Sequence, residues 1–234
     1  MIGFSVKRIW PCLFAILAAA PAYADAVEPG QYVFEGANGT LTVKAGGFTI
    51  DTLGGNGHSC GLEGRLSGLK GETKGDGGDI CRITFTRISG GWRAKAETGE
   101  SCRSFCGMRA DFQGAYLTPP QGCAAGEQAR TRKHFKSLYD AKAYAEAAPL
   151  LQGLLKSCDG FVSWLELGWI RNDLALTRYR LGDAKGCGET LKPLADDAAL
   201  SDDAYREKFP PTDAENYLPI VKAARANLAL CKGK

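Results

Sequence analysis

The sequence has few residues that bind metals and no pattern of a common cofactor site. It contains only two histidines, His58 and His134, and no two cysteines are separated by two residues, the spacing that structural zinc sites often use. A P-loop, a dinucleotide-binding fingerprint and a nucleophile elbow are all missing. His58 has no sequence signal of a positioned partner. We therefore expect no metal, no cofactor and no catalytic residue, in a protein that is not an enzyme.

A hydrophobic run long enough to cross a bilayer is also missing. Residues 9–20 are apolar, but a transmembrane helix needs about 20 apolar residues. This run follows Lys7 and Arg8 and precedes Ala22-Tyr23-Ala24, which has the form of a signal-peptidase site. The sequence predicts a signal peptide over residues 1–24 and no membrane insertion of the mature chain.

The chain has little net charge. Loss of Lys7 and Arg8 with the signal peptide lowers the formal net charge from +3 to +1, so binding to nucleic acid is not indicated. Cleavage also removes Cys12, one of nine cysteines, and leaves an even number. Cysteines in even number in an exported chain predict disulfides. We expect a periplasmic protein, with secretion as the alternative.

Residues 30–116 have the pattern of strands, with frequent glycine and threonine and with alternating apolar residues. The alternating pairs are Tyr32 and Phe34, Leu41 and Val43, Phe48 and Ile50, and Ile83 and Phe85. Asn38-Gly39 and Gly46-Gly47 predict tight reversals between the first three strands. We predict a small antiparallel barrel or sandwich, in which the last strand, at residues 112–116, pairs with the first.

Residues 119–234 are rich in alanine and leucine, with apolar residues at the three- and four-residue spacing of helices. We expect helices at about residues 125–138, 142–156, 162–181, 184–195 and 214–231. The predicted fold class is therefore α+β with two domains, an antiparallel β-domain at residues 25–118 and an all-α domain at residues 119–234.

A repeat lies within the helical domain, where residues 138–154 align with residues 178–194 at an offset of 40. The alignment places Tyr139 with Tyr179, Ala147 with Cys187, Leu151 with Leu191 and Leu154 with Leu194. A small residue followed by leucines at these steps resembles the second helix of tetratricopeptide repeats. The resemblance covers residues 128–194, with a period above the usual 34 and without the Trp-Leu-Gly signature in register.

This resemblance implies a concave surface that holds an extended peptide. The first-helix residues that would line it are Arg132, Lys136, Tyr139, Asn172 and Tyr179. Arginine and lysine bind carboxylates, asparagine bonds to backbone, and tyrosine provides contact area. In the alternative interpretation, the tyrosines are core residues and the charges around Asn172 form salt bridges between helices. The leading hypothesis is an exported binding or scaffold protein with a protein or peptide partner in the cell envelope.

The helix order also predicts two disulfides. An antiparallel pair of helices with a short turn brings its outer ends together, which places Cys123 near Cys158 and Cys187 near Cys231. A helix of about 30 Å separates Cys158 from Cys187. Three pairings remain open for the four cysteines of the β-domain, and we favour Cys60–Cys81 with Cys102–Cys106.

A second resemblance concerns residues 102–116, which contain Cys-Gly, Arg-Ala and Phe-x-Gly-x-Tyr. This segment resembles the end of small β-domains in exported bacterial proteins grouped near lysozyme-inhibitor-like families. The resemblance implies an alternative function, an envelope-defence inhibitor that blocks a lysozyme-like hydrolase through the β-domain.

Overall fold

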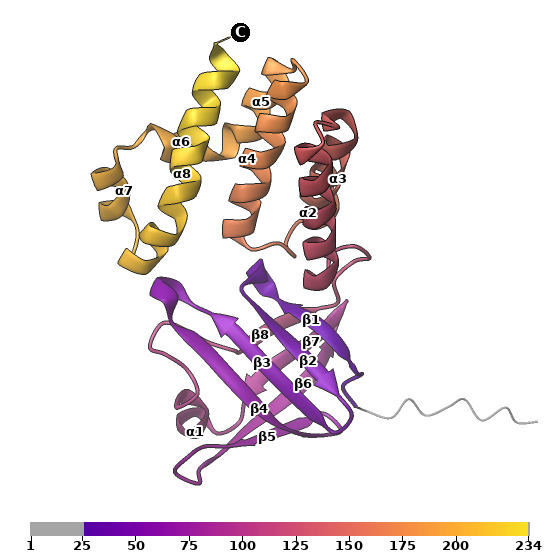
Figure 1. Ribbon diagram of the computed structural model, residues 1–234. Coiled ribbons are helices and arrows are strands. Elements are labelled where there is room, and N and C mark those ends of the chain that lie inside the picture. The colour runs from indigo at the N-terminus through magenta and orange to yellow at the C-terminus, as the bar shows by residue number, and fades with distance from the viewer. Residues whose placement is uncertain (1–25, 234) are drawn as a thin grey trace, which may run out of the picture.

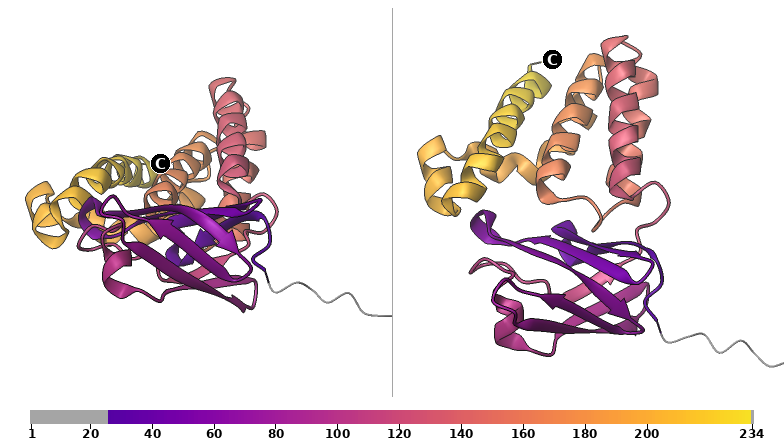
Figure 2. Two further views of the ribbon diagram at one scale, coloured as in Figure 1. Left: turned by 90° about the horizontal axis from the view of Figure 1, so that it is seen from below. Right: turned by 60° about the horizontal axis from the view of Figure 1, so that its bottom comes forward.

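The computed structural model describes residues 26–233 of the chain. It has two parts, an antiparallel β-barrel followed by a set of helices that stand over one end of the barrel (Figure 1). Figure 2 shows the same arrangement from two further directions, and in both views the helices lie on the same side of the barrel. The predicted signal peptide, residues 1–24, lies outside the described residues. The predicted α+β class with a barrel before the helices is confirmed.

The barrel has eight strands, each antiparallel to the next in sequence. The strands are β1 (Gly30–Phe34), β2 (Gly39–Lys44), β3 (Gly47–Leu53), β4 (Ser59–Ser67), β5 (Lys70–Lys74), β6 (Ile80–Ile88), β7 (Gly91–Ala96) and β8 (Gly114–Leu117). Strand β8 pairs with β1 through Val33 opposite Leu117 and Phe34 opposite Tyr116. The predicted closure is therefore confirmed, and it leaves no open sheet edge.

Side chains fill the inside of the barrel. Leu41, Ile50, Ile83 and Phe85 are completely buried, as expected from their alternation with polar neighbours, because successive side chains of a strand point to opposite faces. Tyr116 is also buried and donates a hydrogen bond to the carbonyl of Phe112 at 2.7 Å. Burial raises the pKa of the Tyr116 hydroxyl, so it remains a neutral donor that fixes the start of the closing strand.

The reversal between β1 and β2 differs from the predicted one. It is a short 3₁₀ turn, Glu35–Ala37, in which Gly36 has φ 80°, whereas Asn38 follows the turn and Gly39 already belongs to β2. A side-chain carbon at Gly39 would lie 2.4 Å from the carbonyl oxygen of Asp51. Glycine is therefore needed here for the close approach of β3, and the reversal itself uses Gly36.

The helices are α1 (Gly99–Arg103), α2 (Ala125–Asp140), α3 (Tyr144–Ser157), α4 (Trp164–Arg180), α5 (Ala184–Leu191), a 3₁₀ turn (Lys192–Leu194), α6 (Ala195–Ala199), α7 (Asp202–Lys208) and α8 (Pro211–Lys232). The fourth expected helix, at residues 184–195, ends earlier, because Pro193 at the start of the 3₁₀ turn cannot donate the hydrogen bond that would continue it. Helices α1, α6 and α7 were not predicted. Helix α8 begins at Pro211, which occupies a first-turn position that tolerates proline.

The offset of 40 residues also relates the backbones of the two helix pairs. Helices α2 and α4 end at Asp140 and Arg180, and α3 and α5 begin at Tyr144 and Ala184. Between them, Lys142 and Gly182 both have left-handed φ, 61° and 81°. The aligned small and leucine positions are buried to similar extents: Ala147, Cys187, Leu151 and Leu191 at 0%, Leu154 at 4% and Leu194 at 5% exposure.

The shared turn gives a stability prediction. Lys142 adopts a conformation that costs a residue with a side chain roughly 1 kcal/mol, whereas glycine adopts it without strain. Lys142→Gly should raise the free energy of unfolding by about 1 kcal/mol, and Gly182→Lys should lower it by a similar amount. Urea denaturation of the two variants measures both effects. A loss of stability in Lys142→Gly would contradict the assigned conformation.

Four disulfides join the cysteines between residues 26 and 233. Cys123–Cys158 and Cys187–Cys231 are both confirmed, with Cα atoms 5.3 and 5.7 Å apart. They join the outer ends of the α2–α3 pair and of the α5 and α8 helices. Each therefore closes a helix pair as expected from an antiparallel arrangement.

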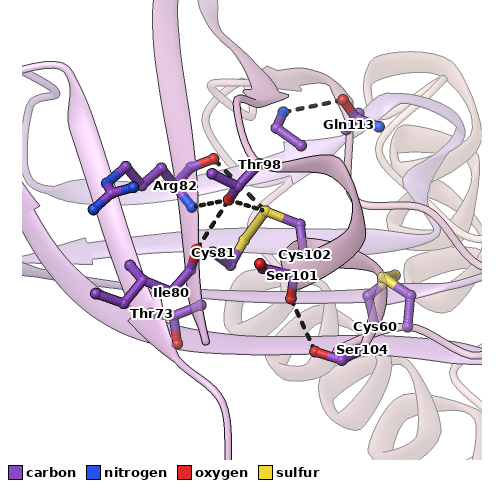
Figure 3. The surroundings of a disulfide bond; sticks show 12 residues. Cys60, Thr73, Ile80, Cys81, Arg82, Thr98, Ser101, Cys102, Ser104 and Gln113 are labelled. Carbon is purple, nitrogen blue, oxygen red and sulfur yellow. Dashed lines mark hydrogen bonds between the residues drawn. A yellow bond between two sulfur atoms is a disulfide. The ribbon is translucent and has the colours of Figure 1, made fainter. Parts of the chain in front are cut away.

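The two predicted disulfides of the barrel are wrong. Cys60 bonds to Cys106 and Cys81 bonds to Cys102. Strand β5 lies between β4, which carries Cys60, and β6, which carries Cys81, so these two cysteines are not on neighbouring strands. Helix α1 packs against β6 and places Cys102 there, close to Thr98, which bonds to Ile80 and Arg82 of β6 (Figure 3).

Candidate functional site

The barrel and helix α8 share a capping interaction. The amide of Thr212, in the first turn of α8, donates to the side-chain oxygen of Asn56 at 2.9 Å, and the amide of Asn56 donates to the carboxylate of Asp213 at 2.9 Å. These are the two bonds of a capping box, but the capping residue comes from the turn between β3 and β4. Pro210, which precedes α8, makes no side-chain capping bond.

The same turn has the backbone that this contact needs. Asn56 has φ 59°, which asparagine tolerates better than most residues, and Gly57 has φ 73°. A side-chain carbon at Gly57 would lie 2.9 Å from the side chain of Thr212. The barrel turn therefore sits directly on the amino end of α8, and a cap of this type contributes about 1 kcal/mol.

A groove of about 770 Å³ lies beside this contact. We call it the barrel–helix groove. On the barrel it is lined by the ends of β2, β3 and β4 and the turn at residues 54–57, and on the helices by the first residues of α4 and α8. Its residues with larger or charged side chains are Asn38, Asp51, Thr52, Leu53, Trp164, Leu165, Asp213 and Asn216. Ligand sites occur preferentially in such junctions.

Two large apolar side chains are exposed in this groove. Leu53, at the end of β3, is 63% exposed, and Trp164, the first residue of α4, is 38% exposed. The ring of Trp164 lies 4.7 Å from that of Tyr217, centroid to centroid, at an angle of 33°. Tyr217 in turn stacks on the buried Tyr205. This row of rings holds Trp164 in place before any partner arrives, so little rotamer freedom is left to lose on binding.

The groove also carries two carboxylates. Asp51 and Leu53 are two residues apart on β3 and both point outward. Across from Asp51 lie Thr40 on β2 and Gly61 on β4, neither of which has a long side chain. Asp213 is half-buried and reaches the groove from α8. Carboxylates beside exposed apolar side chains are suited to bind a partner that is both basic and apolar.

The predicted concave surface is formed in part. Arg132, Lys136 and Tyr139 line a second hollow of about 560 Å³ together with Lys133, Phe135, Asp140 and Asp173. Two of its cationic side chains, Arg132 and Lys136, are already paired. Arg132 binds Glu166 at 2.7 Å and Asp173 at 3.1 Å, and Lys136 binds Asp140 at 2.7 Å.

Burial raises the pKa of the Asp173 carboxyl, and the guanidinium of Arg132 opposes this shift. A hydrogen bond with Tyr139 raises the pKa of Arg180, so the tyrosine connects α2 to α4. Of the two charged residues beside Asn172, Asp173 therefore forms the salt bridge between helices that the alternative interpretation predicts, whereas no ion pair of Arg171 is found among residues 26–233. Arg132, Lys136 and Tyr139 of this surface are thus all engaged in contacts within the chain.

Asn172 does not lie on that surface, and this part of the prediction is wrong. Its side chain is 3% exposed and donates to the carbonyls of Gly168 at 3.0 Å and Ile220 at 3.1 Å. Asn227 donates to the Asn172 side-chain oxygen at 3.0 Å. Asn172 therefore faces α8, because α4 is covered on that side by the last helix. Tyr179 is half-buried and packs against the cluster between α4, α5 and α8.

The chain matches no protein-family model, no curated protein and no solved structure. Function is therefore inferred from the two surfaces. No group of three or more His, Cys, Asp or Glu side chains between residues 26 and 233 is placed to hold a metal ion. None of the helices in that range has both the length and the hydrophobicity of a bilayer-spanning segment.

The barrel–helix groove was missed by sequence reasoning. Two signals were present. The inward positions of Phe48 and Ile50 leave Leu53 as an apolar residue on the outer face of the same strand. The second signal is Trp164, a large apolar residue in the first turn of a helix. It follows Ser163, which caps the helix by accepting a hydrogen bond from the amide of Glu166. Neither signal shows that residues more than 100 positions apart meet.

Proposed function

We propose that this chain is an exported, non-enzymatic binding protein that holds a protein or peptide partner of the cell envelope in the barrel–helix groove. The observation that carries the proposal is the exposure of Leu53 and Trp164 in one groove, with the ring of Trp164 held by Tyr217. Exposed apolar side chains with a polar surround are typical of interaction sites, and aromatic anchors held in place are typical of their centres.

The compartment is supported by two features. Four disulfides join all the cysteines of residues 26–233, and disulfides form and persist in oxidising compartments such as the periplasm. The amino-terminal sequence has the three regions of a signal peptide.

The helix packing supports a tetratricopeptide-like arrangement. Helix α3 packs between α2 and α4, and α5 packs between α4 and α8. Each second helix of a pair is thus shared with the next first helix, which is how stacked repeats bury a continuous core. The first helices α4 and α8 present their amino ends to the groove.

Photo-crosslinking in cells tests the proposal. A photoreactive amino acid in place of Leu53 should give a defined protein adduct, because that side chain is exposed within the groove. The same amino acid in place of Asp76, in the exposed loop between β5 and β6, is the control and should give none. Adducts should disappear when Trp164→Ala is added to the Leu53 variant. The absence of adducts at residue 53 in envelope-localised protein would contradict the groove as the binding surface.

One observation favours inhibition of a hydrolase as a second candidate. Met108 is 82% exposed at the tip of a loop that is fixed by the Cys60–Cys106 disulfide and by Arg103, which donates to the carbonyls of Met108 at 2.6 Å and Ala110 at 2.9 Å. A rigid loop with an apolar tip is suited to enter an enzyme cleft. Crosslinks from residue 108 but not from residue 53, together with loss of muramidase activity, would favour this function.

A further inference from the structure

The charge of the barrel–helix groove has one sign. Among its lining residues, Asp51 and Asp213 are the charged ones, and no lysine, arginine or histidine lines it. Several other surfaces of the described chain mix both signs, as at Arg132 with Glu166. The groove therefore favours a cationic over an anionic partner, because like charges across an interface are disfavoured.

Both carboxylates have open space beside them. A side-chain carbon at Gly61 would have one neighbour within 4 Å, an oxygen of Asp51 at 3.9 Å, and one at Gly55 would have only an oxygen of Asp213 at 3.9 Å. Asp51 is exposed, and its carboxylate forms no hydrogen bond or ion pair with residues 26–233. The Asp51 carboxylate can therefore accept a hydrogen bond from a partner, and there is open space beside it. The Asp213 carboxylate, in contrast, already accepts a hydrogen bond from the amide of Asn56.

The apolar side chains complete the recognition. Leu53 lies two residues from Asp51 on the same outer face of β3, and Trp164 faces the groove from α4. An ammonium or guanidinium group is attracted by a carboxylate and also by the face of a tryptophan ring. The methylene stem of lysine or arginine, and an apolar neighbour in the partner, can cover Leu53.

We propose that the barrel–helix groove binds a peptide segment in which a lysine or arginine is flanked by apolar side chains, with the cation at Asp51 and the apolar side chains on Leu53 and Trp164. This rests on the proposed function, since it assigns the chemistry of the partner at the same groove. The occupant is a segment of another protein.

The test uses three blocked pentapeptides and the full mature protein. Their sequences are Ala-Leu-Lys-Leu-Ala, Ala-Leu-Glu-Leu-Ala and Ala-Ser-Lys-Ser-Ala, each acetylated and amidated so that only the side chains differ. Binding is followed by the shift of the Trp164 indole signal in ¹H–¹⁵N spectra, assigned with a Trp164→Phe variant. The first peptide should shift this signal saturably, and the other two should bind at least about fivefold more weakly.

Two variants test separately the charge of Asp51 and the open space beside it. Asp51→Asn keeps the shape and should weaken binding of the lysine peptide by about threefold to fivefold, the effect expected for one partly exposed ion pair. Gly61→Leu fills the space beside Asp51 without removing a charge and should weaken binding at least tenfold. Asp76→Asn removes an equal charge in the exposed loop between β5 and β6 and is the control. Circular dichroism and the melting temperature show that each variant is folded.

The outcomes distinguish this inference from the proposed function. Equal binding of the lysine and glutamate peptides, or unchanged binding by Asp51→Asn and Gly61→Leu, would overturn the cationic preference. Adducts at residue 53 in cells would still support the groove as a binding surface in that case. Concentration-dependent self-association that Trp164→Ala removes, with no shift by any peptide, would assign the groove to a second copy of the chain and overturn the inference.

Discussion

Replacing Cys187 and Cys231 together with alanine should lower the free energy of unfolding of the helical part by about 4 kcal/mol. The disulfide closes a loop with a sequence separation of 44 residues, and in a chain-entropy treatment such a loop restricts the unfolded chain by about this amount. Both cysteines belong to the core shared by α5 and α8. Typical proteins have a free energy of unfolding of about 5–15 kcal/mol, and one part of a chain has less than the whole. A loss of this size is therefore a large fraction of the stability of the helical part.

Hydrogen exchange read by mass spectrometry measures this effect in each part of the chain. Peptides from α4, α5 and α8 should lose protection in the double variant, whereas peptides from β2, β3 and β6 should keep it. Cys81 with Cys102 replaced by alanine is the matched control, since it should act on the barrel and leave the helices protected. Equal loss of protection in the barrel and the helices on removal of Cys187–Cys231 would show that the two parts unfold as one unit.

Replacing Asn172 with leucine should have the second largest effect and should lower the free energy of unfolding by about 3 kcal/mol. Asn172→Leu removes two donated bonds to the carbonyls of Gly168 and Ile220 and the acceptor of Asn227. These groups stay buried between α4 and α8, and an unsatisfied buried polar group costs about 1–3 kcal/mol. Leucine has no polar atom that could replace any of these bonds. Urea denaturation of the variant measures the loss.

A double variant tests the interpretation of the asparagine pair. Asn227→Leu should lower the free energy of unfolding much less in the Asn172→Leu background than in the unchanged protein, because the hydrogen-bond partner of Asn227 has already been removed. Lys136→Ala, which removes an exposed pair with Asp140, should change the stability by less than about 0.5 kcal/mol. Additive effects of the two asparagine replacements would contradict the bond between their side chains.

The parts of the fold that follow a regular period were predictable from the sequence. The alternation of Phe48 and Ile50 indicated which face of β3 is buried, and the offset of 40 residues indicated which positions of α3 and α5 meet their neighbours. Closure of the barrel followed from a general requirement, since an open edge exposes unpaired backbone groups. The Cys123–Cys158 disulfide followed from the reversal of two helices of similar length, and the Cys187–Cys231 disulfide followed from the last helix running back along the helix that begins near Cys187.

The parts that depend on distant contacts were not predictable. The barrel disulfides depend on the position of α1 against β6, and α1 is a helix of five residues without a clear periodic pattern. Asn172 was expected on the concave surface because the resemblance to tetratricopeptide repeats placed it there. The close approach of α8 buries it instead, at a point where a side-chain carbon on Gly168 would lie 2.6 Å from Ile220. The groove lies between β3 and the helices α4 and α8, and no local sequence pattern predicts that these elements are neighbours.

The barrel disulfides also have a consequence for the order in which the chain matures. Cys81–Cys102 is nested inside the loop that Cys60–Cys106 closes. A chain that crosses a membrane amino end first exposes the thiols of Cys60 and Cys81 to oxidants before either native partner emerges. A bond formed at that moment joins the wrong pair, and thiol–disulfide exchange is then needed to replace it. The helical disulfides join cysteines that emerge consecutively. Under the proposed export, the barrel, which is synthesised first, is therefore the part expected to need this exchange.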